Sequence, residues 1–185
     1  MNKQIYFVTG NKEKVMILQN ALSDSGIEIK QVKMECPEIQ DEDVIEVAKF
    51  SAKWAADKLK HPAIKNDCGL IIESLNGFPG FATKYVEKWL KADGFLKLMK
   101  GIKDRRMKYV DVTAYCEPGK EPIAFISETK GCMSEEKSGK YGWELDYIFI
   151  VEGDKKTMAN YPDEDRVKLL NDKHYHNLLD FLRGK

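Results

Sequence analysis

Residues 65–84 read Lys65-Asn66-Asp67-Cys68-Gly69-Leu70, continue through Leu75-Asn76-Gly77-Phe78-Pro79-Gly80, and end at Lys84. The apolar pair Ala63 and Ile64 in front of them predicts a short buried strand that ends at Asp67. Glycine allows positive φ and proline fixes φ, so the Gly-Phe-Pro-Gly run predicts a tight turn whose backbone can approach a ligand. Lys84 follows near the start of a predicted helix, where a cation opposes the helix dipole and is suited to an anion. Taken alone, the segment is better explained as a strand, a turn and a solvated lysine.

The composition restricts the class of protein. The chain has 185 residues, 43% of them hydrophobic, which suits one domain or two intimately packed lobes, and we predict a single domain over 1–185. Its 30 basic and 30 acidic residues balance, so no overall positive field points to a nucleic-acid polymer. No apolar run approaches the length of a membrane span, and the N-terminus does not read as a signal peptide. The four cysteines include no CxxC pair and do not indicate a zinc site. We therefore predict a cytoplasmic protein with no membrane or nucleic-acid partner.

The N-terminus predicts a strand, a glycine turn and a helix. Residues 4–8 are apolar enough for a strand, and residues 12–22 have the apolar spacing of a helix. Between them, backbone amides, the Thr9 hydroxyl and the Asn11 carboxamide converge with the Lys14 ammonium, which makes a candidate phosphate site. The chain lacks the GxxxxGK[ST] of a P-loop, so an ordinary capped helix with solvent-facing lysines is the alternative.

Two carboxylates lie in predicted loops or strand ends. Residues 27–34 predict a second strand, and a proline-containing loop with Glu38 leads into an amphipathic helix over 41–59. Read alone, Glu38 is slightly better explained as a solvated surface residue. Together with Asp67 it supplies hard oxygen ligands, which suit a Mg²⁺ ion in the hydrolysis of a phosphoanhydride.

The rest of the chain predicts further helices and strands. Helical pieces are expected over 84–91, 94–100 and 163–182, and strands over 107–116, 123–132 and 148–151, the first two forming a hairpin. This order predicts an α/β fold with a mixed sheet rather than a doubly wound one. A cleft between a helical lobe and the sheet would be a natural ligand site. His174 and His176 are two positions apart and are expected at the surface.

Four motifs follow one another over residues 1 to about 100: Phe7-Val8-Thr9-Gly10-Asn11-Lys12-Glu13-Lys14, Pro37-Glu38-Ile39-Gln40, Asn66-Asp67-Cys68-Gly69-Leu70 and Leu75-Asn76-Gly77-Phe78-Pro79-Gly80. In order and spacing they resemble the motifs of the Ham1-like inosine triphosphate pyrophosphatases, which hydrolyse non-canonical purine nucleoside triphosphates. Further on, Tyr141-Gly142-Trp143 with Asp146 and Ile148-Phe149 resembles the Phe-Gly-Trp-Asp-Pro-x-Phe of that family. The resemblance implies a mixed sheet with two lobes around a central cleft, and a homodimer. It also implies Mg²⁺-dependent cleavage between the α- and β-phosphates, which yields a nucleoside monophosphate and pyrophosphate.

The resemblance also implies the site residues. They are Thr9, Asn11, Lys14 and Lys84 for phosphates, Glu38 and Asp67 for the metal, Tyr141, Trp143 and Asp146 toward the base, and Arg166 where the family has a lysine. Asp67 would also orient and deprotonate the attacking water. Asp67 and Lys14 are therefore the candidate catalytic residues.

The chain departs from the family's motifs mainly at the residues expected to recognise the base. Asn66 stands where many members have a first acidic residue, Glu144-Leu145 interrupts the Gly-Trp-Asp match, and Tyr147 replaces its proline. The Ser-His-Arg that the family uses for base recognition is absent, and Leu170-Asn171-Asp172, followed by Lys173 and His174, stands in its place. Losing such hydrogen-bond donors changes discrimination between substrates by large factors. The alternative is therefore a divergent nucleotide-binding homologue with altered base specificity or little activity. A purely structural α/β domain would leave the polar residues of the turns unexplained.

Overall fold

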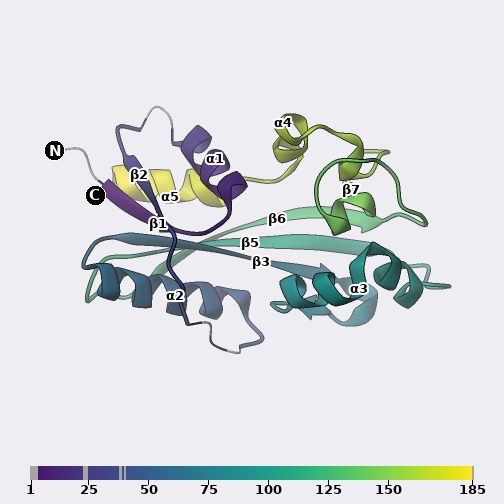
Figure 1. The fold of residues 1–185 in the computed structure, drawn as a ribbon, viewed down its shortest axis with the longest axis horizontal. Helices are drawn as coiled ribbons and strands as arrows, with labels where there is room; N and C mark the ends of the chain where they lie inside the picture. Colours follow the sequence, from purple (N-terminus) through teal and green to yellow (C-terminus); the bar gives the residue numbers. More distant parts are fainter. Residues whose placement is uncertain (1–3, 23–24, 38, 40, 185) are drawn as a thin grey trace. The chain divides into compact units, whose positions relative to one another are not determined.

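A computed structural model describes residues 4–22, 25–37, 39 and 41–184 of the chain, apart from the side chain of Glu13 (Figure 1). Its strands are β1 Gln4–Val8, β2 Glu28–Val32, β3 Ala63–Ile72, β4 Pro79–Gly80, β5 Arg106–Cys116, β6 Ile123–Met133 and β7 Phe149–Val151. Its α-helices are α1 Lys12–Ala21, α2 Val44–Leu59, α3 Thr83–Leu98, α4 Asp163–Arg166 and α5 Lys173–Arg183. Four 3-10 turns are η1 Glu73–Leu75, η2 Glu144–Tyr147, η3 Met158–Asn160 and η4 Val167–Leu169.

The described strands form a seven-stranded sheet in the order β2-β1-β3-β5-β6-β7, with β4 paired to β3. Strand β1 runs parallel to β2 and β3, whereas the pairs β3–β4 and β6–β7 are antiparallel. The predicted α/β fold with a mixed sheet is therefore confirmed.

The chain divides into two compact units. Unit 1 consists of Met1–Asp67, Asp111–Ser127 and Asp172–Lys185, and unit 2 of Cys68–Val110 and Glu128–Asn171. Each unit has a hydrophobic core of its own. The core of unit 1 includes Ile5, Phe7, Leu18, Ile64, Tyr115 and Leu178, and that of unit 2 includes Leu70, Phe95, Met107, Met133, Ile148 and Phe149. A single domain over 1–185, and a cleft between lobes, stay predictions.

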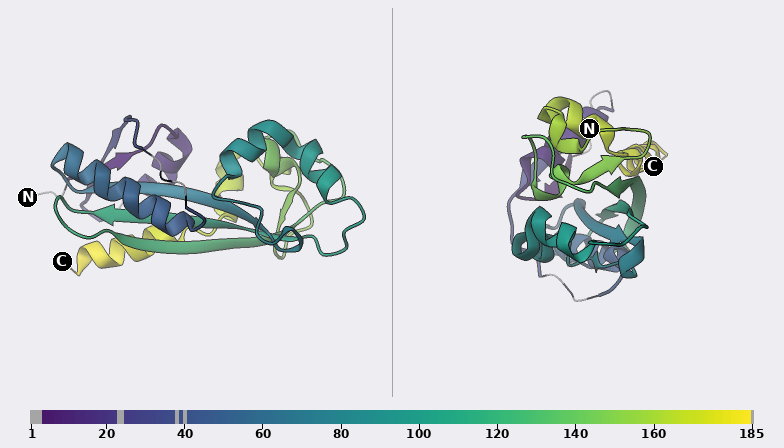
Figure 2. Two further views of the ribbon diagram at one scale, coloured as in Figure 1. Left: turned by 90° about the horizontal axis from the view of Figure 1, so that it is seen from below. Right: turned by 90° about the vertical axis from the view of Figure 1, so that its right-hand side faces the viewer.

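In unit 1, helices cover both faces of the strands. Helices α1 and α5 lie on one face and contribute to the same core, whereas α2 lies on the other (Figures 1 and 2). Helix α2 packs through small side chains, including the fully buried Ala52 and Ala55. It begins after Asp43, whose Oδ1 accepts a hydrogen bond from Ile45 N at 2.8 Å and so satisfies one of the open amides of the first turn. The predicted helix over 41–59 thus starts three residues later.

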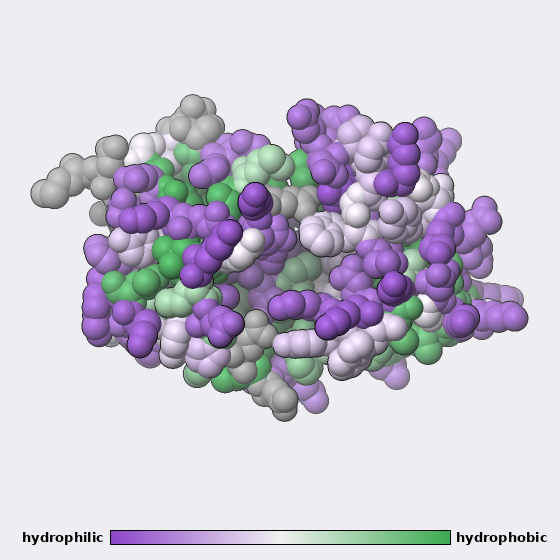
Figure 3. Space-filling view, in the orientation of Figure 1, coloured by the Kyte–Doolittle hydropathy of each residue, from purple (hydrophilic) through white to green (hydrophobic). Residues whose placement is uncertain are grey.

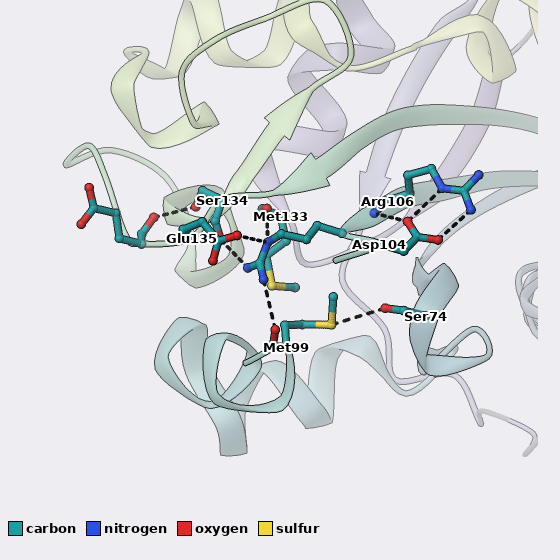
Figure 4. Close-up of polar contacts among 9 residues, drawn as sticks. Ser74, Met99, Asp104, Arg106, Met133, Ser134 and Glu135 are labelled. Carbon is teal, nitrogen blue, oxygen red and sulfur yellow. Dashed lines mark hydrogen bonds and ion pairs between the residues drawn. The ribbon is translucent and has the colours of Figure 1, made fainter. Parts of the chain in front are cut away.

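In unit 2, an arginine fixes the end of α3. The Arg105 guanidinium donates to three backbone carbonyls, those of Met133 (Nε, 2.8 Å), Met99 (Nη1, 3.1 Å) and Ser134 (Nη2, 2.5 Å). Figure 4 shows these carbonyls around one point, where the end of α3 meets the end of β6. Helix α3 is continuous from 83 to 98 except at Lys91, whose φ of 53° and ψ of −177° break the helix where the two predicted pieces meet.

Two expectations about local structure are wrong. Strand β3 continues to Ile72, so Asp67 lies inside a strand and not at its end, because Leu70 and Ile72 extend the strand into the core of unit 2. The predicted helix over 163–182 is interrupted between η4 and α5, where Leu170 is extended (φ −78°, ψ 142°). Asn171 N donates there to Thr129 Oγ1 (2.9 Å), which ties the segment to β6 instead of to a helical turn.

No helix among the described residues is long and apolar enough to cross a membrane. The face of the molecule in Figure 3 carries mostly hydrophilic residues, with hydrophobic ones in small separate areas. Location in the cytoplasm stays a prediction.

Candidate functional site

The turn between β1 and α1 is held by its own polar groups. Thr9 N donates to Val32 O at the end of β2 (3.1 Å), and Thr9 Oγ1 accepts from Asn11 N (3.1 Å). Asn11 Oδ1 accepts from Lys14 N at 3.3 Å and thereby caps the first turn of α1. A Cβ on Gly10 would meet no atom within 4 Å, so the backbone of the turn is open at that point. The structure therefore brings Thr9, Asn11 and Lys14 together at one helix N-terminus, a geometry suited to an anion.

Lys14 links this turn to β3. Its Nζ donates to the backbone oxygen of Asn66 at 3.3 Å, across 52 positions of the sequence. The next residue along β3 is Asp67, the predicted acid. The candidate phosphate lysine and the backbone that carries the candidate base are thus neighbours within unit 1.

Asn66 and Asp67 occupy opposite faces of β3, because successive side chains of a strand alternate. Asn66 Nδ2 donates to Thr113 Oγ1 of β5 at 3.1 Å, whereas Asn66 Oδ1 is buried without a hydrogen-bond partner among the described residues. The face of Asn66 also carries Ile64, which packs in the same core as α1. Asn66 therefore places an uncharged side chain on the face of β3 that it shares with Ile64, opposite the face of Asp67.

The metal prediction depends on hard oxygen donors. Glu38, its first predicted ligand, lies outside the described residues. In the part of the chain that the structure describes, no three His, Cys, Asp or Glu side chains gather as a metal cluster. The Asp67 carboxylate is nevertheless a hard oxygen donor, and Mg²⁺ is commonly held by one or two carboxylates together with substrate phosphates. The residues present fit a Mg²⁺ ion that takes its remaining ligands from a nucleotide.

Lys84 belongs to unit 2 and lies in the first turn of α3, as predicted. Its side chain is exposed, with Nζ 5.9 Å from the centre of the Tyr85 ring. The start of the helix is fixed by Thr83, whose Oγ1 donates to Gly80 O (2.6 Å) and accepts from Leu70 N (2.7 Å). A cation is thus presented on a well-anchored helix start.

The other unit 2 residues lie around η2. The Trp143 side chain is 60% exposed, whereas Asp146 and Arg166 are buried and form an ion pair (Nη1–Oδ2, 2.8 Å). Tyr141 is half-buried, with Lys140 Nζ 5.1 Å from its ring centre. Direct contact of these residues with a substrate stays a prediction.

The residues in place of the family's Ser-His-Arg are engaged elsewhere. Asn171 Nδ2 donates to Glu128 O (3.1 Å). His174 is buried, not at the surface as expected, and its Nδ1 lies 2.5 Å from Ser127 Oγ. The reason is that α5 begins at Lys173 and turns His174 toward β6. Asn171 is therefore bonded to the backbone of Glu128 at the surface, and His174 is bonded to Ser127 inside the protein.

Sequence reasoning missed Glu87, a half-buried acid on α3. Burial raises its pKa above the ordinary 4.5, a hydrogen bond from the Leu145 backbone opposes this rise, and the nearby Asp146 and Glu144 carboxylates add to it. Glu144 Oε2 in turn accepts from Ala92 N at 3.4 Å. No local signal marks Glu87, because only the packing of α3 against η2 gives it these neighbours.

Unit 2 also has a hollow of about 600 Å³, which is lined by other residues. Its wall includes Arg106, Lys108, Glu128, Lys130, Cys132 and Glu152 and contains no predicted site residue. Lys108 and Glu128 form an ion pair there (2.8 Å). Because the wall carries both basic and acidic side chains, it favours neither an anionic nor a cationic ligand.

Comparison with known proteins gives matches over most of the chain. The model of the Ham1 family matches residues 5–171. A relative named dITP/XTP pyrophosphatase from Methanopyrus kandleri is 38% identical over 166 residues, which is 90% of this chain and 88% of the relative. One of the same name from Pyrococcus horikoshii is 42% identical over 163 residues, 88% of this chain and 87% of the relative.

Solved structures agree with the sequence matches. The structure of the Ham1 protein of Staphylococcus aureus superimposes with a TM-score of 0.83 at 25% identity, over 98% of this chain and 99% of that one. The family match and the alignments with the curated relatives each cover most of the chain. This chain belongs to the Ham1 family.

Proposed function

We propose that this protein is a Mg²⁺-dependent nucleoside triphosphate pyrophosphatase that acts on non-canonical, inosine- or xanthosine-type nucleotides. The products would be the nucleoside monophosphate and pyrophosphate. The observation that carries the proposal is the hydrogen bond from Lys14 Nζ to Asn66 O, because it joins the anion-suited turn to the strand that bears Asp67. The dITP/XTP pyrophosphatase name of the relatives supports the substrate class.

The phosphates are the part of the substrate that unit 1 is suited to bind. The amides of the β1–α1 turn, the Thr9 hydroxyl and the Lys14 ammonium supply donors and positive charge for the triphosphate. Lys84, on α3 of unit 2, is the second lysine that we propose for the phosphates. Binding a triphosphate through backbone amides and lysines does not read the base, so this end of the site is tolerant of base identity.

Asp67 is the proposed general base. A water oxygen attacks the α-phosphorus, the bond from that phosphorus to the bridging oxygen breaks, and pyrophosphate leaves with the bond electrons. The water proton passes to the Asp67 carboxylate. Glu38 and Asp67 would hold Mg²⁺, which when bound neutralises charge on the phosphate oxygens.

The base would meet unit 2. Trp143 presents an exposed indole, and Tyr141 lies two residues before it. Aromatic stacking tolerates different bases, whereas Leu170-Asn171-Asp172 stands where the resemblance places the Ser-His-Arg that reads a keto-purine edge. We therefore expect weaker discrimination among bases than a site with the family's Ser-His-Arg would give.

The test is a substrate panel. Purified protein with Mg²⁺ is given ITP, XTP, dUTP and the ordinary triphosphates, and released pyrophosphate is measured. We expect pyrophosphate from ITP or XTP, and a loss of about 10²–10⁴-fold in rate for Asp67→Asn. Chelation of the metal should stop the reaction, and Mn²⁺ can be compared with Mg²⁺.

The same panel decides between the two functions that the chain allows. The internal contacts of Asn171 and His174 favour a divergent base site, so a nucleotide-binding protein with little turnover is the second candidate. No pyrophosphate from any nucleotide, with binding of one retained, would establish it. We further propose a homodimer in the cytoplasm. Light scattering after gel filtration that gives a mass near 21 kDa, that of one chain, would contradict the dimer.

A further inference from the structure

A buried ion pair lies beneath the turn that carries Trp143. The side chains of Asp146 and Arg166 are 7% and 5% exposed, and their Oδ2 and Nη1 are 2.8 Å apart. The same Asp146 oxygen accepts a hydrogen bond from the backbone N of Trp143 at 2.8 Å. One carboxylate oxygen therefore holds both the guanidinium and the peptide of the tryptophan.

Gly142 shows how closely the backbone lies on this pair. A Cβ at this position would be 2.1 Å from Asp146 Oδ2 and 2.9 Å from Arg166 Nε. Its φ of +79° is also a conformation that glycine adopts without strain. The turn before Trp143 thus rests directly on the ion pair and cannot shift toward it.

The following turn, η2, is held from a second side. Glu144 Oε2 accepts from Ala92 N of α3 at 3.4 Å, and Leu145 N donates to Glu87 of the same helix. Contacts with the ion pair and with helix α3 therefore hold the backbone of residues 142–145, which includes Trp143. Trp143 as a residue remains 60% exposed.

An exposed aromatic ring on an immobilised backbone is a pre-organised binding surface, because little conformational freedom is lost when a flat ligand stacks on it. The residues that immobilise it are themselves inaccessible. Arg166 spans from the buried Asp146 to the exposed Asp163 (Nη2–Oδ1, 3.0 Å), so its guanidinium is directed to two carboxylates of its own unit.

We propose that Asp146 and Arg166 are positioning residues that hold the Trp143 indole as the stacking surface for the nucleobase, and that neither touches the substrate. The inference rests on the proposed function for the identity of the ligand as a nucleotide. It replaces direct substrate contact, which the resemblance implies for Asp146 and Arg166, with an action through Trp143.

The experiment uses a protein in which Trp143 is the remaining tryptophan. The chain has three tryptophans, so Trp54→Phe and Trp89→Phe leave Trp143 as the fluorophore. Asp67→Asn is added so that nucleotide is not consumed. The probes are ITP and inorganic tripolyphosphate, each with Mg²⁺, because tripolyphosphate offers the same phosphates without a base.

Arg166→Met should lower the fluorescence anisotropy of Trp143 and weaken ITP binding by about tenfold, the size expected for losing one base stack. Tripolyphosphate binding should change less than twofold. In the protein with Asp67 intact, KM for ITP should rise with kcat nearly constant, because stacking is made equally in ground and transition states. Arg166→Lys, which keeps the charge but not the fork of two nitrogens, should lie between Arg166→Met and the unmutated arginine.

The matched control is Asp163→Asn, which removes the exposed partner of the same arginine and should leave both affinities within twofold. Should Arg166→Met not fold, Asp146→Leu with Arg166→Met, or Arg166→Lys alone, gives the same comparison. Equal weakening of ITP and tripolyphosphate, or unchanged ITP affinity, would overturn the positioning role. Absence of any ITP binding or hydrolysis in the parent protein would instead count against the proposed function.

Discussion

The β1–α1 turn of unit 1 and the Trp143 segment of unit 2 present ligand groups in different ways. In the turn, Thr9, Asn11 and Lys14 are ordered by hydrogen bonds over two or three positions. In the Trp143 segment, the backbone beneath an exposed ring is held by Asp146, which pairs with the buried Arg166, 23 positions after Trp143. The turn is partly exposed and is ordered mainly by neighbouring residues, with one long-range bond from Lys14 to Asn66, whereas the Trp143 segment is ordered by a distant and buried pair.

The difference has an energetic consequence. A polar group that remains partly hydrated can lose its partner at modest cost, whereas a buried charge that loses its partner keeps the full penalty of desolvation. Substitutions in the turn should therefore act mainly on binding and activity. Substitutions of the ion pair beneath Trp143 should change stability as well as the binding of the base.

The largest effect is expected where the buried pair is broken. Arg166→Met leaves the Asp146 carboxylate buried beside an apolar chain and should lower the free energy of unfolding by about 3–5 kcal/mol, measured by urea unfolding. Asp146→Leu with Arg166→Met should recover most of that loss, because no charge is then left buried. A single variant as stable as the double one would show that the pair is not desolvated.

A smaller loss should follow from releasing the end of α3. Arg105→Met removes three hydrogen bonds to backbone carbonyls from a side chain that is 13% exposed, and should cost about 2–3 kcal/mol in the same assay. The neighbouring Arg106 pairs with Asp104 at the surface and is the matched control (Figure 4). Arg106→Met should leave the unfolding midpoint unchanged, and equal losses for the two arginines would contradict the assignment.

In the turn, the effect should appear in activity and not in stability. Lys14→Met removes the ammonium proposed to bind the triphosphate and should lower kcat/KM by about 10–100-fold, the loss expected for one or two charge-assisted hydrogen bonds. The midpoint of thermal unfolding should stay close to that of the parent protein. Lys12→Met, an exposed lysine of the same helical turn, should change kcat/KM less than twofold. Equal effects of the two substitutions would indicate a general field and no specific contact.

The smallest effect concerns Glu87 and depends on pH. The pKa of Glu87 is raised in the folded protein, so folding favours the protonated carboxyl. Its contribution to the free energy of unfolding is fully present below the ordinary pKa of 4.5 and is lost as the pH rises through the folded pKa. Glu87→Gln should therefore be more stable than the parent at pH 7, by less than about 1 kcal/mol, and the two should converge below pH 4.

Thermal unfolding across pH 4 to 8 checks this prediction. Glu42→Gln, at an exposed position, serves as the control and should follow the parent throughout. A Glu87→Gln protein that is less stable at pH 7 would reverse the sign of the effect.

The local sequence pattern was sufficient to predict those helices and strands whose bounds depend on their own residues. Periodicity predicted β1, α1, α2, β5 and β6 close to their observed bounds, since apolar spacing records which face is buried. It failed for β3, whose central Asn66-Asp67-Cys68-Gly69 carries no apolar alternation, and for the break at Leu170, which depends on Thr129 in another strand. In both cases the deciding partner lies far away in the sequence.

By itself, the sequence determined the mixed α/β class and the family, because these follow from periodicity and ordered motifs, and it predicted the phosphate turn and Asp67 as the candidate base. Only the tertiary structure decided that Lys14 reaches the backbone of β3, that His174 is buried, and that Asp146 and Arg166 meet beneath Trp143. The physical reason is that burial and charge pairing are properties of neighbours in space, and a side chain read along the chain does not reveal which distant group will desolvate it.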